Sequence, residues 1–288
     1  NNYMKAEQTL KEAINVWESI RGGLSDNYAN QISIMETQIN TYNTLRDVLV
    51  HQNKFDLALE FIERSRARIF VEQLARRLSS NAIDTPKSPS IQEIKQIAEQ
   101  QNSTLVTYSI AEKDFQVEGK TVTQESELLI WVIQPTGKIN FRRVDLKALG
   151  QKENTNLAEL VARSRMYIDA PTGREKGVTN VEQTLPKSPL KILHKLLIES
   201  IVDLLPTNPN AHVVFIPEQS LWRLSFPTLQ DDAGKFLVEK HTIRISPSIQ
   251  SLDFTRRQAE KVRKLAKLAK DILVVGNPTN LNVNMPFN

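Results

Sequence analysis

Histidine is the residue of this 288-residue chain that could activate a thiol nucleophile, and the chain has no cysteine. A histidine that acts as a general base must lie close to a nucleophile, within hydrogen-bonding reach. The four histidines are His51, His194, His212 and His241. The first lies in the expected turn of a helical hairpin, the second in an amphipathic helix, and the other two in expected strands. We therefore expect all four to be structural.

Other signatures of catalysis are missing from the sequence. Ser220 and Ser225 lack the flanking glycines of a nucleophile elbow. Gly173 and Gly177 are isolated and precede no Gly-Lys-Ser/Thr of a phosphate loop. No group of His, Asp and Glu has the spacing of zinc ligands. We expect no catalytic residue within these 288 residues, no metal and no cofactor.

A dense basic run, Glu63-Arg64-Ser65-Arg66-Ala67-Arg68, lies in the N-terminal part of the chain. Arg64 and Arg68 are one helical turn apart, which is typical of a solvated helix face. Alternatively, Arg64, Arg66 and Arg68 bind a carboxylate or a partner at the junction with the next domain, because a guanidinium group pairs with a carboxylate through two hydrogen bonds. Both interpretations stay open.

Apolar residues at helical spacing predict three helices in residues 1–80. These residues are Ala6, Leu10, Ala13, Ile14 and Trp17, then Ile32, Met35, Ile39, Tyr42, Leu45 and Leu49, and then Ala58, Phe61, Ile62, Ile69, Leu74 and Leu78. The second and third helices, joined by a polar turn at residues 51–55, resemble a tetratricopeptide (TPR) unit. Arg46 departs from the TPR pattern, which usually has a small residue there. A generic helical bundle is the alternative.

Polar and proline-containing residues mark a boundary after the helices. We expect residues 1–80 to be the end of a longer helical array, residues 81–90 to be a linker, and residues 91–288 to form a second domain. Ser90 and Glu93 have the spacing of a capping box, which predicts a helix start at this point.

Strands and helices alternate in the second domain, which predicts a mainly parallel sheet with helices on both faces and a β-meander at its edge. The apolar run at residues 212–216 is typical of a central strand that is covered on both faces. Residues 236–245 alternate in the manner of a hairpin, and Ser246-Pro247-Ser248 predicts the start of a helix.

Two segments of this domain resemble the first half of a CHAT domain. They are HVVFIPEQSLWRLSFPTLQDDAGKFLVEKHTIRISPSIQSL at residues 212–252 and DILVVGNP at residues 271–278. CHAT domains are caspase-like cysteine peptidase domains of the caspase and separase clan, which typically follow TPR repeats and are abundant in cyanobacteria. The resemblance implies a cyanobacterial type of TPR protein with a C-terminal CHAT domain. It also implies that the catalytic histidine and cysteine lie beyond Asn288.

Five residues are candidates for lining a peptide cleft in such a domain. Trp222 and Arg223 follow one predicted strand, whereas Gly276, Asn277 and Pro278 follow another. Ligand sites of α/β sheets form at the carboxyl ends of the strands, which is where these residues are expected. Packing of the same residues in the protein interior is the alternative.

The resemblance leads to two main hypotheses about function. In the first, the chain is part of a TPR-regulated caspase-like cysteine endopeptidase that cleaves protein substrates, and it supplies the partner-binding helices and the non-catalytic half of the peptidase fold. The alternative is a non-catalytic TPR–CHAT scaffold for protein–protein interaction or signalling. A third possibility is a standalone regulatory half-domain. All three imply a protein or peptide partner on the helices.

Composition limits the other partners. Hydrophobic content of 40% and charged content of 24% are ordinary for a globular protein. No apolar run approaches the roughly 20 residues that cross a bilayer, so we expect no membrane contact. A net charge of +4 is too small to indicate nucleic acid, and we expect none. The lack of cysteine fits a reducing, cytoplasmic setting.

Overall fold

The computed structural model describes residues 2–23, 28–78, 88–117, 119–147, 149–150, 155–169 and 188–266. By its internal contacts the chain divides into two compact units, Asn1–Leu252 and Asp253–Asn288, and each is described by itself. The predicted Gly276-Asn277-Pro278 loop, with the strand expected before it, lies outside the described residues.

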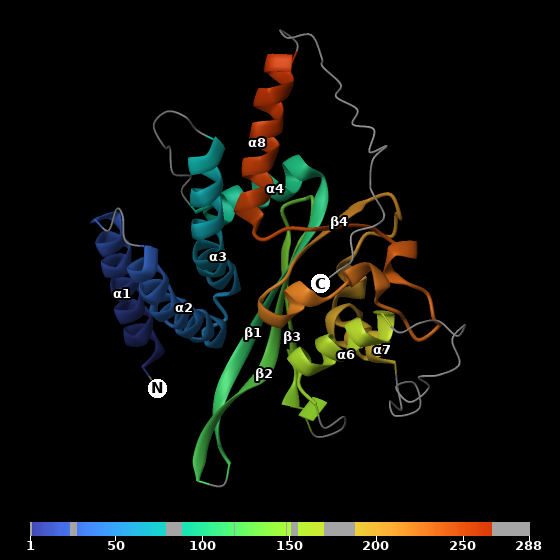
Figure 1. Ribbon diagram of the computed structural model, residues 1–288, viewed down its shortest axis with the longest axis horizontal. Coiled ribbons are helices and arrows are strands. Elements are labelled where there is room, and N and C mark those ends of the chain that lie inside the picture. The colour runs from blue at the N-terminus through green and yellow to red at the C-terminus, as the bar shows by residue number, and fades with distance from the viewer. Residues whose placement is uncertain are drawn as a thin grey trace, which may run out of the picture. The chain divides into compact units, whose positions relative to one another are not determined.

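The N-terminal part of the first unit is helical, as predicted (Figure 1). It contains α1 (Tyr3–Gly23), α2 (Tyr28–His51), α3 (Phe55–Leu78) and α4 (Ile91–Gln101). The tight turn between α2 and α3 places Asn53 in the left-handed region, with φ of 58°. The predicted capping box begins α4, because Ser90 Oγ accepts the N–H of Glu93 and the Glu93 carboxylate accepts the N–H of Ser90.

A mixed sheet follows, with five strands in the described residues and the order β3-β2-β1-β4-β5. The strands are β1 (Ser103–Val117), β2 (Lys120–Ile133), β3 (Ile139–Asp145), β4 (His212–Ile216) and β5 (Thr242–Ile245). Strands β1, β4 and β5 are parallel, whereas β2 and β3 form the antiparallel meander at one edge. The predicted fold class, TPR-like helices followed by an α/β sheet with a meander edge, is confirmed.

The hairpin expected at residues 236–245 is wrong. Leu237–Glu239 form a short 3-10 helix, and β5 pairs in parallel with β4 instead of returning on a neighbouring segment. Alternation along a sequence shows that side chains face opposite sides of a sheet, but it does not show which strand is the partner.

Helices and short 3-10 helices complete the described chain. They are α6 (Leu157–Asp169), α7 (Pro189–Leu197), η1 (Glu199–Leu204), η2 (Gln219–Arg223), η3 (Phe226–Thr228), η4 (Leu237–Glu239) and α8 (Ile249–Ala266). Figure 1 shows α1–α3 on one side of the sheet and α6 and α7 on the other. Within the described ranges, no helix combines the length and the apolar character needed to cross a bilayer.

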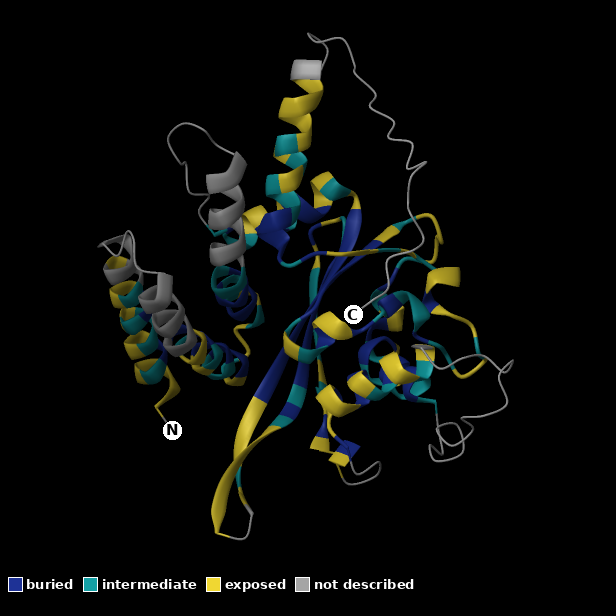
Figure 2. Ribbon diagram, in the orientation of Figure 1, coloured by how far each residue is buried: buried dark blue, intermediate teal, exposed yellow. Residues whose placement is uncertain are grey.

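Each face of the sheet carries its own hydrophobic core, because successive side chains of a strand point to opposite faces. Tyr108 and Ile110 of β1 pack with α6 and α7, whereas Leu105 and Ala111 pack with α2–α4. Figure 2 shows that the centre of the sheet is buried and that the far end of the β1–β2 hairpin is exposed. The helical hairpin therefore shares a core with the sheet.

Aromatic side chains join α3 to strands β2 and β3 within this shared core. Trp131 of β2 donates from Nε1 to the carbonyl oxygen of Phe55 at 2.9 Å, and Phe55 stacks on Phe141 of β3 with ring centroids 4.2 Å apart. The start of α3 is thus held on the sheet. The domain boundary expected at residues 81–90 stays a prediction, because residues 79–87 lie outside the described part of the chain.

The described part of the second unit belongs to α8. Its charged side chains form ion pairs along the helix: Arg256 contacts Asp253 at 2.8 Å and Glu260 at 2.7 Å, and Arg257 contacts Asp253 at 2.6 Å. These pairs have the three- and four-residue spacing that stabilises a helix from its own surface.

The carboxylate of Glu7 ties α1 to the turn between α2 and α3. Its oxygens accept hydrogen bonds from Lys11 Nζ at 2.6 Å, Lys54 Nζ at 2.6 Å and Gln52 Nε2 at 3.0 Å. The hydrogen bonds from Lys11 and then Lys54 lower the pKa of the Glu7 carboxyl to about 2. The charged form of Glu7 is therefore the form that the folded state favours.

We expect Glu7→Gln to lower the free energy of unfolding by about 1–2 kcal/mol near neutral pH, because two charge-assisted hydrogen bonds are lost. The folded-state pKa lies below the ordinary value, so the contribution of Glu7 is complete above pH of about 4.5 and is lost as the pH falls toward about 2. Urea unfolding at about pH 7 and about pH 3 should show a difference between variant and wild type that shrinks at the lower pH. Glu12→Gln, on the exposed side of α1, is the control and should have little effect at either pH. An undiminished Glu7→Gln effect at low pH would contradict this account.

Candidate functional site

Strands β4 and β5 run parallel to β1, and their carboxyl ends lie at the same edge of the sheet, beside the middle of β1. Pairing between β1 and β4 ends with Thr107 opposite Ile216. Strand β1 then continues, whereas the chain leaves β4 at Pro217. Residues 108–110 therefore have no strand beside them on this side among the described residues, and their backbone groups need other partners.

Side chains take the place of the missing strand. Glu218, two residues after β4, accepts the N–H of Ile110 at 2.8 Å. Arg66 of α3 donates from Nη2 to the carbonyl oxygen of Tyr108, and the same nitrogen lies 3.5 Å from Glu218 Oε2. One carboxylate and one guanidinium group, paired with each other, thus continue the hydrogen bonding of the sheet.

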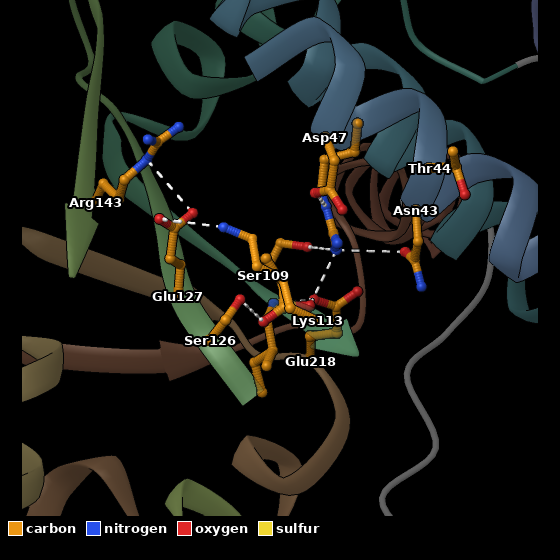
Figure 3. Close-up of polar contacts among 12 residues, drawn as sticks. Asn43, Thr44, Asp47, Ser109, Lys113, Ser126, Glu127, Arg143 and Glu218 are labelled. Carbon is orange, nitrogen blue, oxygen red and sulfur yellow. Dashed lines mark hydrogen bonds and ion pairs between the residues drawn. The ribbon is translucent and has the colours of Figure 1, made fainter. Parts of the chain in front are cut away.

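Arg46 of α2 completes this set. Its side chain is 2% exposed, and Nη1 donates to Ser109 Oγ at 2.8 Å and to the carbonyl oxygen of Ile110 at 3.1 Å. Nε donates to Asp47 at 2.9 Å, and Nη1 lies 3.4 Å from Asn43 Oδ1. Figure 3 shows Asn43 and Asp47 on α2, facing Ser109 across this network. Arg46, at a position where a TPR helix usually has a small residue, thus reaches from α2 into the sheet.

Glu63, one helical turn before Arg66, extends the network to α8. Its side chain is fully buried, and Oε2 accepts the N–H of Ile249 at 2.7 Å and also the N–H of Gln250. Burial away from water raises the pKa of the Glu63 carboxyl, and Arg66, with Nη1 3.8 Å from Oε1, opposes this rise. We call Arg46, Glu63, Arg66 and Glu218, with the backbone of residues 108–110, the junction site.

The side chains of the junction site hold backbone in place. Its side chains are two carboxylates and two guanidinium groups, and it holds no histidine or cysteine. In the residues that the structure describes, no group of three or more His, Cys, Asp and Glu could bind a metal ion. The hydrogen bonds that the structure shows at this site position the backbone of Tyr108 and Ile110.

The three arginines predicted at the domain junction occupy different surroundings. Arg66 reaches the junction site, whereas the guanidinium of Arg64 lies over the ring of Phe61, 5.7 Å from its centroid. The side chain of Arg68 lies outside the described residues. The part that these arginines play in binding a partner stays a prediction.

The predicted cleft residues Trp222 and Arg223 lie in η2, close in sequence to Glu218. Trp222 is 46% exposed and Arg223 is exposed, whereas the flanking Leu221 and Leu224 are buried. The loop is thus held by its leucines and presents its aromatic and basic side chains to solvent. Whether they contact a peptide stays a prediction, and Gly276, Asn277 and Pro278 lie outside the described residues.

The histidines lie on four different elements: His51 ends α2, His194 is in α7, His212 begins β4, and His241 precedes β5. His51 is stacked on Tyr3, with ring centroids 5.5 Å apart. Burial lowers the pKa of both His194 and His241, which favours the neutral imidazole.

Sequence reasoning missed the roles of Ser109 and Glu218 and recognised Arg46 only as an irregularity. That irregularity was the available signal, because a large charged residue at a position of close helix packing needs a partner. Glu218 carries no such signal, since its partner Ile110 lies 108 residues away in sequence.

The fold combines TPR-like helices with a mixed sheet, and the two share a hydrophobic core. The CHAT domain family model matches residues 187–287, which include α7, β4, β5 and α8. Strands β1–β3 lie outside the matched residues but form one sheet with β4 and β5.

Two curated proteins that are named for tetratricopeptide repeats are similar to parts of this chain. The human protein named Tetratricopeptide repeat protein 28 is 27% identical over 190 residues, which is 64% of this chain and 7% of that protein. The mouse protein of the same name is 32% identical over 113 residues, which is 38% of this chain and 4% of that protein. The chain thus spans less than a tenth of either relative. Together with the family match, these similarities support a TPR plus CHAT architecture.

We expect Arg46→Ala to lower the free energy of unfolding by about 2–4 kcal/mol, because the hydroxyl of Ser109 and the carbonyl of Ile110 lose a buried donor. Arg142→Ala is the matched control, since Arg142 also contacts a carboxylate, Asp203 at 3.0 Å, but its side chain is 38% exposed. The control should cost less than about 1 kcal/mol. Urea denaturation measures both, and equal losses would show that the network around Arg46 contributes no more than a surface ion pair.

Proposed function

We propose that this chain is part of a caspase-like cysteine endopeptidase whose activity is governed by its TPR-like helices. The chain supplies the helices that bind a protein or peptide partner, together with the non-catalytic half of the peptidase fold. The observation that supports this most is that Arg46 and Arg66 attach α2 and α3 to residues 108–110 of β1, beside the carboxyl end of β4. Active sites of α/β sheets form at that edge, so a partner that moves the helices would also move the surroundings of the site.

In the proposed reaction, a histidine imidazole takes the proton of a cysteine thiol, and the thiolate attacks the carbonyl carbon of a substrate peptide bond. The amine product leaves with that proton, and water then hydrolyses the thioester. Because these 288 residues contain no cysteine, the thiol comes from sequence outside them, and we place the catalytic histidine there too.

We also propose that Trp222 and Arg223, with Gly276, Asn277 and Pro278, line the peptide cleft of this enzyme. The exposure of Trp222 on a loop anchored by two buried leucines supports this role. A large aromatic side chain held on a fixed loop can bind a peptide at a small cost in conformational entropy.

A non-catalytic TPR–CHAT scaffold is the second candidate. The junction site favours it, because its side chains hold the backbone of β1 against α2 and α3. In a scaffold, the same contacts would keep the helices at a constant orientation on the sheet for partner binding. The two candidate functions differ only in whether the whole protein also has a catalytic cysteine and a catalytic histidine.

A peptide-cleavage assay tests the proposed activity. This chain alone should not cleave a fluorogenic peptide library above background. A longer protein from the same gene, continuing past Asn288, should cleave, and replacing its cysteine by alanine should abolish cleavage. In that protein, Trp222→Ala should raise KM by about threefold to tenfold if Trp222 contacts the substrate.

Two results would contradict the peptidase proposal. One is cleavage by the pure 288-residue chain, and the other is a longer protein that binds a partner but lacks the cysteine or the histidine. The second result would identify the scaffold.

A further inference from the structure

The first turn of α8 receives a carboxylate from a helix that is remote in sequence. The first N–H groups of a helix have no partner within it, and they need an acceptor from elsewhere. Ser248 Oγ accepts the N–H of Ser251 at 3.1 Å, as an ordinary cap would. The N–H groups of Ile249 and Gln250 are bonded instead by Glu63 of α3, 186 residues away from Ile249.

Helix α3 also contacts the start of α4, but in a weaker way. Glu60 Oε2 accepts the N–H of Ile91 at 2.9 Å, and Glu60 is only partly buried. Helix α4 has in addition the reciprocal capping box of Ser90 and Glu93. Its start therefore depends less on α3 than the start of α8 does, which makes Glu60 a matched control.

Because Glu63 is fully buried, its carboxylate either keeps its hydrogen bonds to α8 or leaves the interior, with few states in between. A fully buried carboxylate without its hydrogen bonds would be strongly destabilising, so a displaced Glu63 must become hydrated. Arg66, one turn along α3, holds Tyr108 and Glu218. Because one helical turn carries both contacts, a displacement of α3 acts on Tyr108 of β1 and on the start of α8 together.

We propose that Glu63 is a releasable clamp through which the TPR-like helices determine whether the first turn of α8 is formed. This clamp is the regulatory link within the proposed function and rests on it. Helix α8 directly precedes residues 267–288 in sequence, which carry the predicted cleft loop Gly276-Asn277-Pro278. A partner that shifts α3 would therefore loosen the first turn of α8.

Hydrogen exchange, followed by mass spectrometry on this chain, measures the clamp directly. We expect Glu63→Ala to speed exchange of the first turn of α8 by about tenfold, the size expected when a helix cap is lost. Glu63→Gln keeps one acceptor oxygen and the volume of the side chain, so we expect about threefold. Glu60→Ala should leave α8 within about twofold of wild type and should speed exchange at the start of α4.

A second substitution tests transmission from the helices. Glu7→Gln loosens the attachment of α1 to the turn that precedes α3, and it should speed exchange at the start of α8 in the wild-type chain. On the Glu63→Ala background it should add nothing, because the link is already broken. An equal effect of Glu7→Gln on both backgrounds would overturn the role of Glu63 as the link.

The clamp is also overturned if Glu63→Ala and Glu63→Gln, in chains that stay folded by circular dichroism, leave exchange of α8 within about twofold of wild type. An equal effect of Glu60→Ala on α8 overturns it too. These measurements involve no peptide cleavage. A failed cleavage assay with a positive exchange result would therefore remove the peptidase and retain the clamp, whereas the opposite pair of results would remove the clamp alone.

Discussion

Strand β1 extends past the end of its parallel neighbour β4, and much of the structure depends on how that exposed edge is satisfied. Buried backbone N–H and C=O groups without partners would cost several kcal/mol. Here Glu218 and Arg46 bond Ile110, and Arg66 bonds Tyr108. The partners come from two helices and a loop, so the helical hairpin and the loop after β4 are both fixed by the same short stretch of strand.

In three of the helices, the first N–H group donates to a carboxylate of another element. Glu60 bonds the first N–H of α4, Glu63 that of α8, and Glu125 of β2 accepts the N–H of Leu157 in α6 at 2.6 Å. Burial raises the pKa of Glu125, as it does that of Glu63. A helix that starts on another element's side chain is coupled to that element more tightly than a helix capped by its own sequence, because moving either one leaves a buried polar group without its partner.

These couplings bear on both candidate functions. The core that α2–α4 share with the sheet, with Trp131 bonded to the start of α3, shows that the TPR-like helices are an integral part of the first unit. In a peptidase, such helices transmit the binding of a partner to the edge of the sheet where an active site would form. In a scaffold, they hold a constant binding surface. The junction site serves either purpose because it positions backbone.

The sequence by itself determined the local structure: the helices of residues 1–80, the capping box of Ser90 and Glu93, the buried strand at residues 212–216 and the fold class. Each depends on side-chain periodicity or on groups a few residues apart, which a sequence displays directly. Only the tertiary structure decided that β5 runs parallel to β4 and that Arg46 bonds Ser109, 63 residues away. Strand partners and buried polar networks depend on which surfaces meet when the chain packs. Nothing in the sequence near Arg46, Ser109 or Glu218 indicates that the three lie close together. Their hydrogen bonds form only when packing removes water from around them.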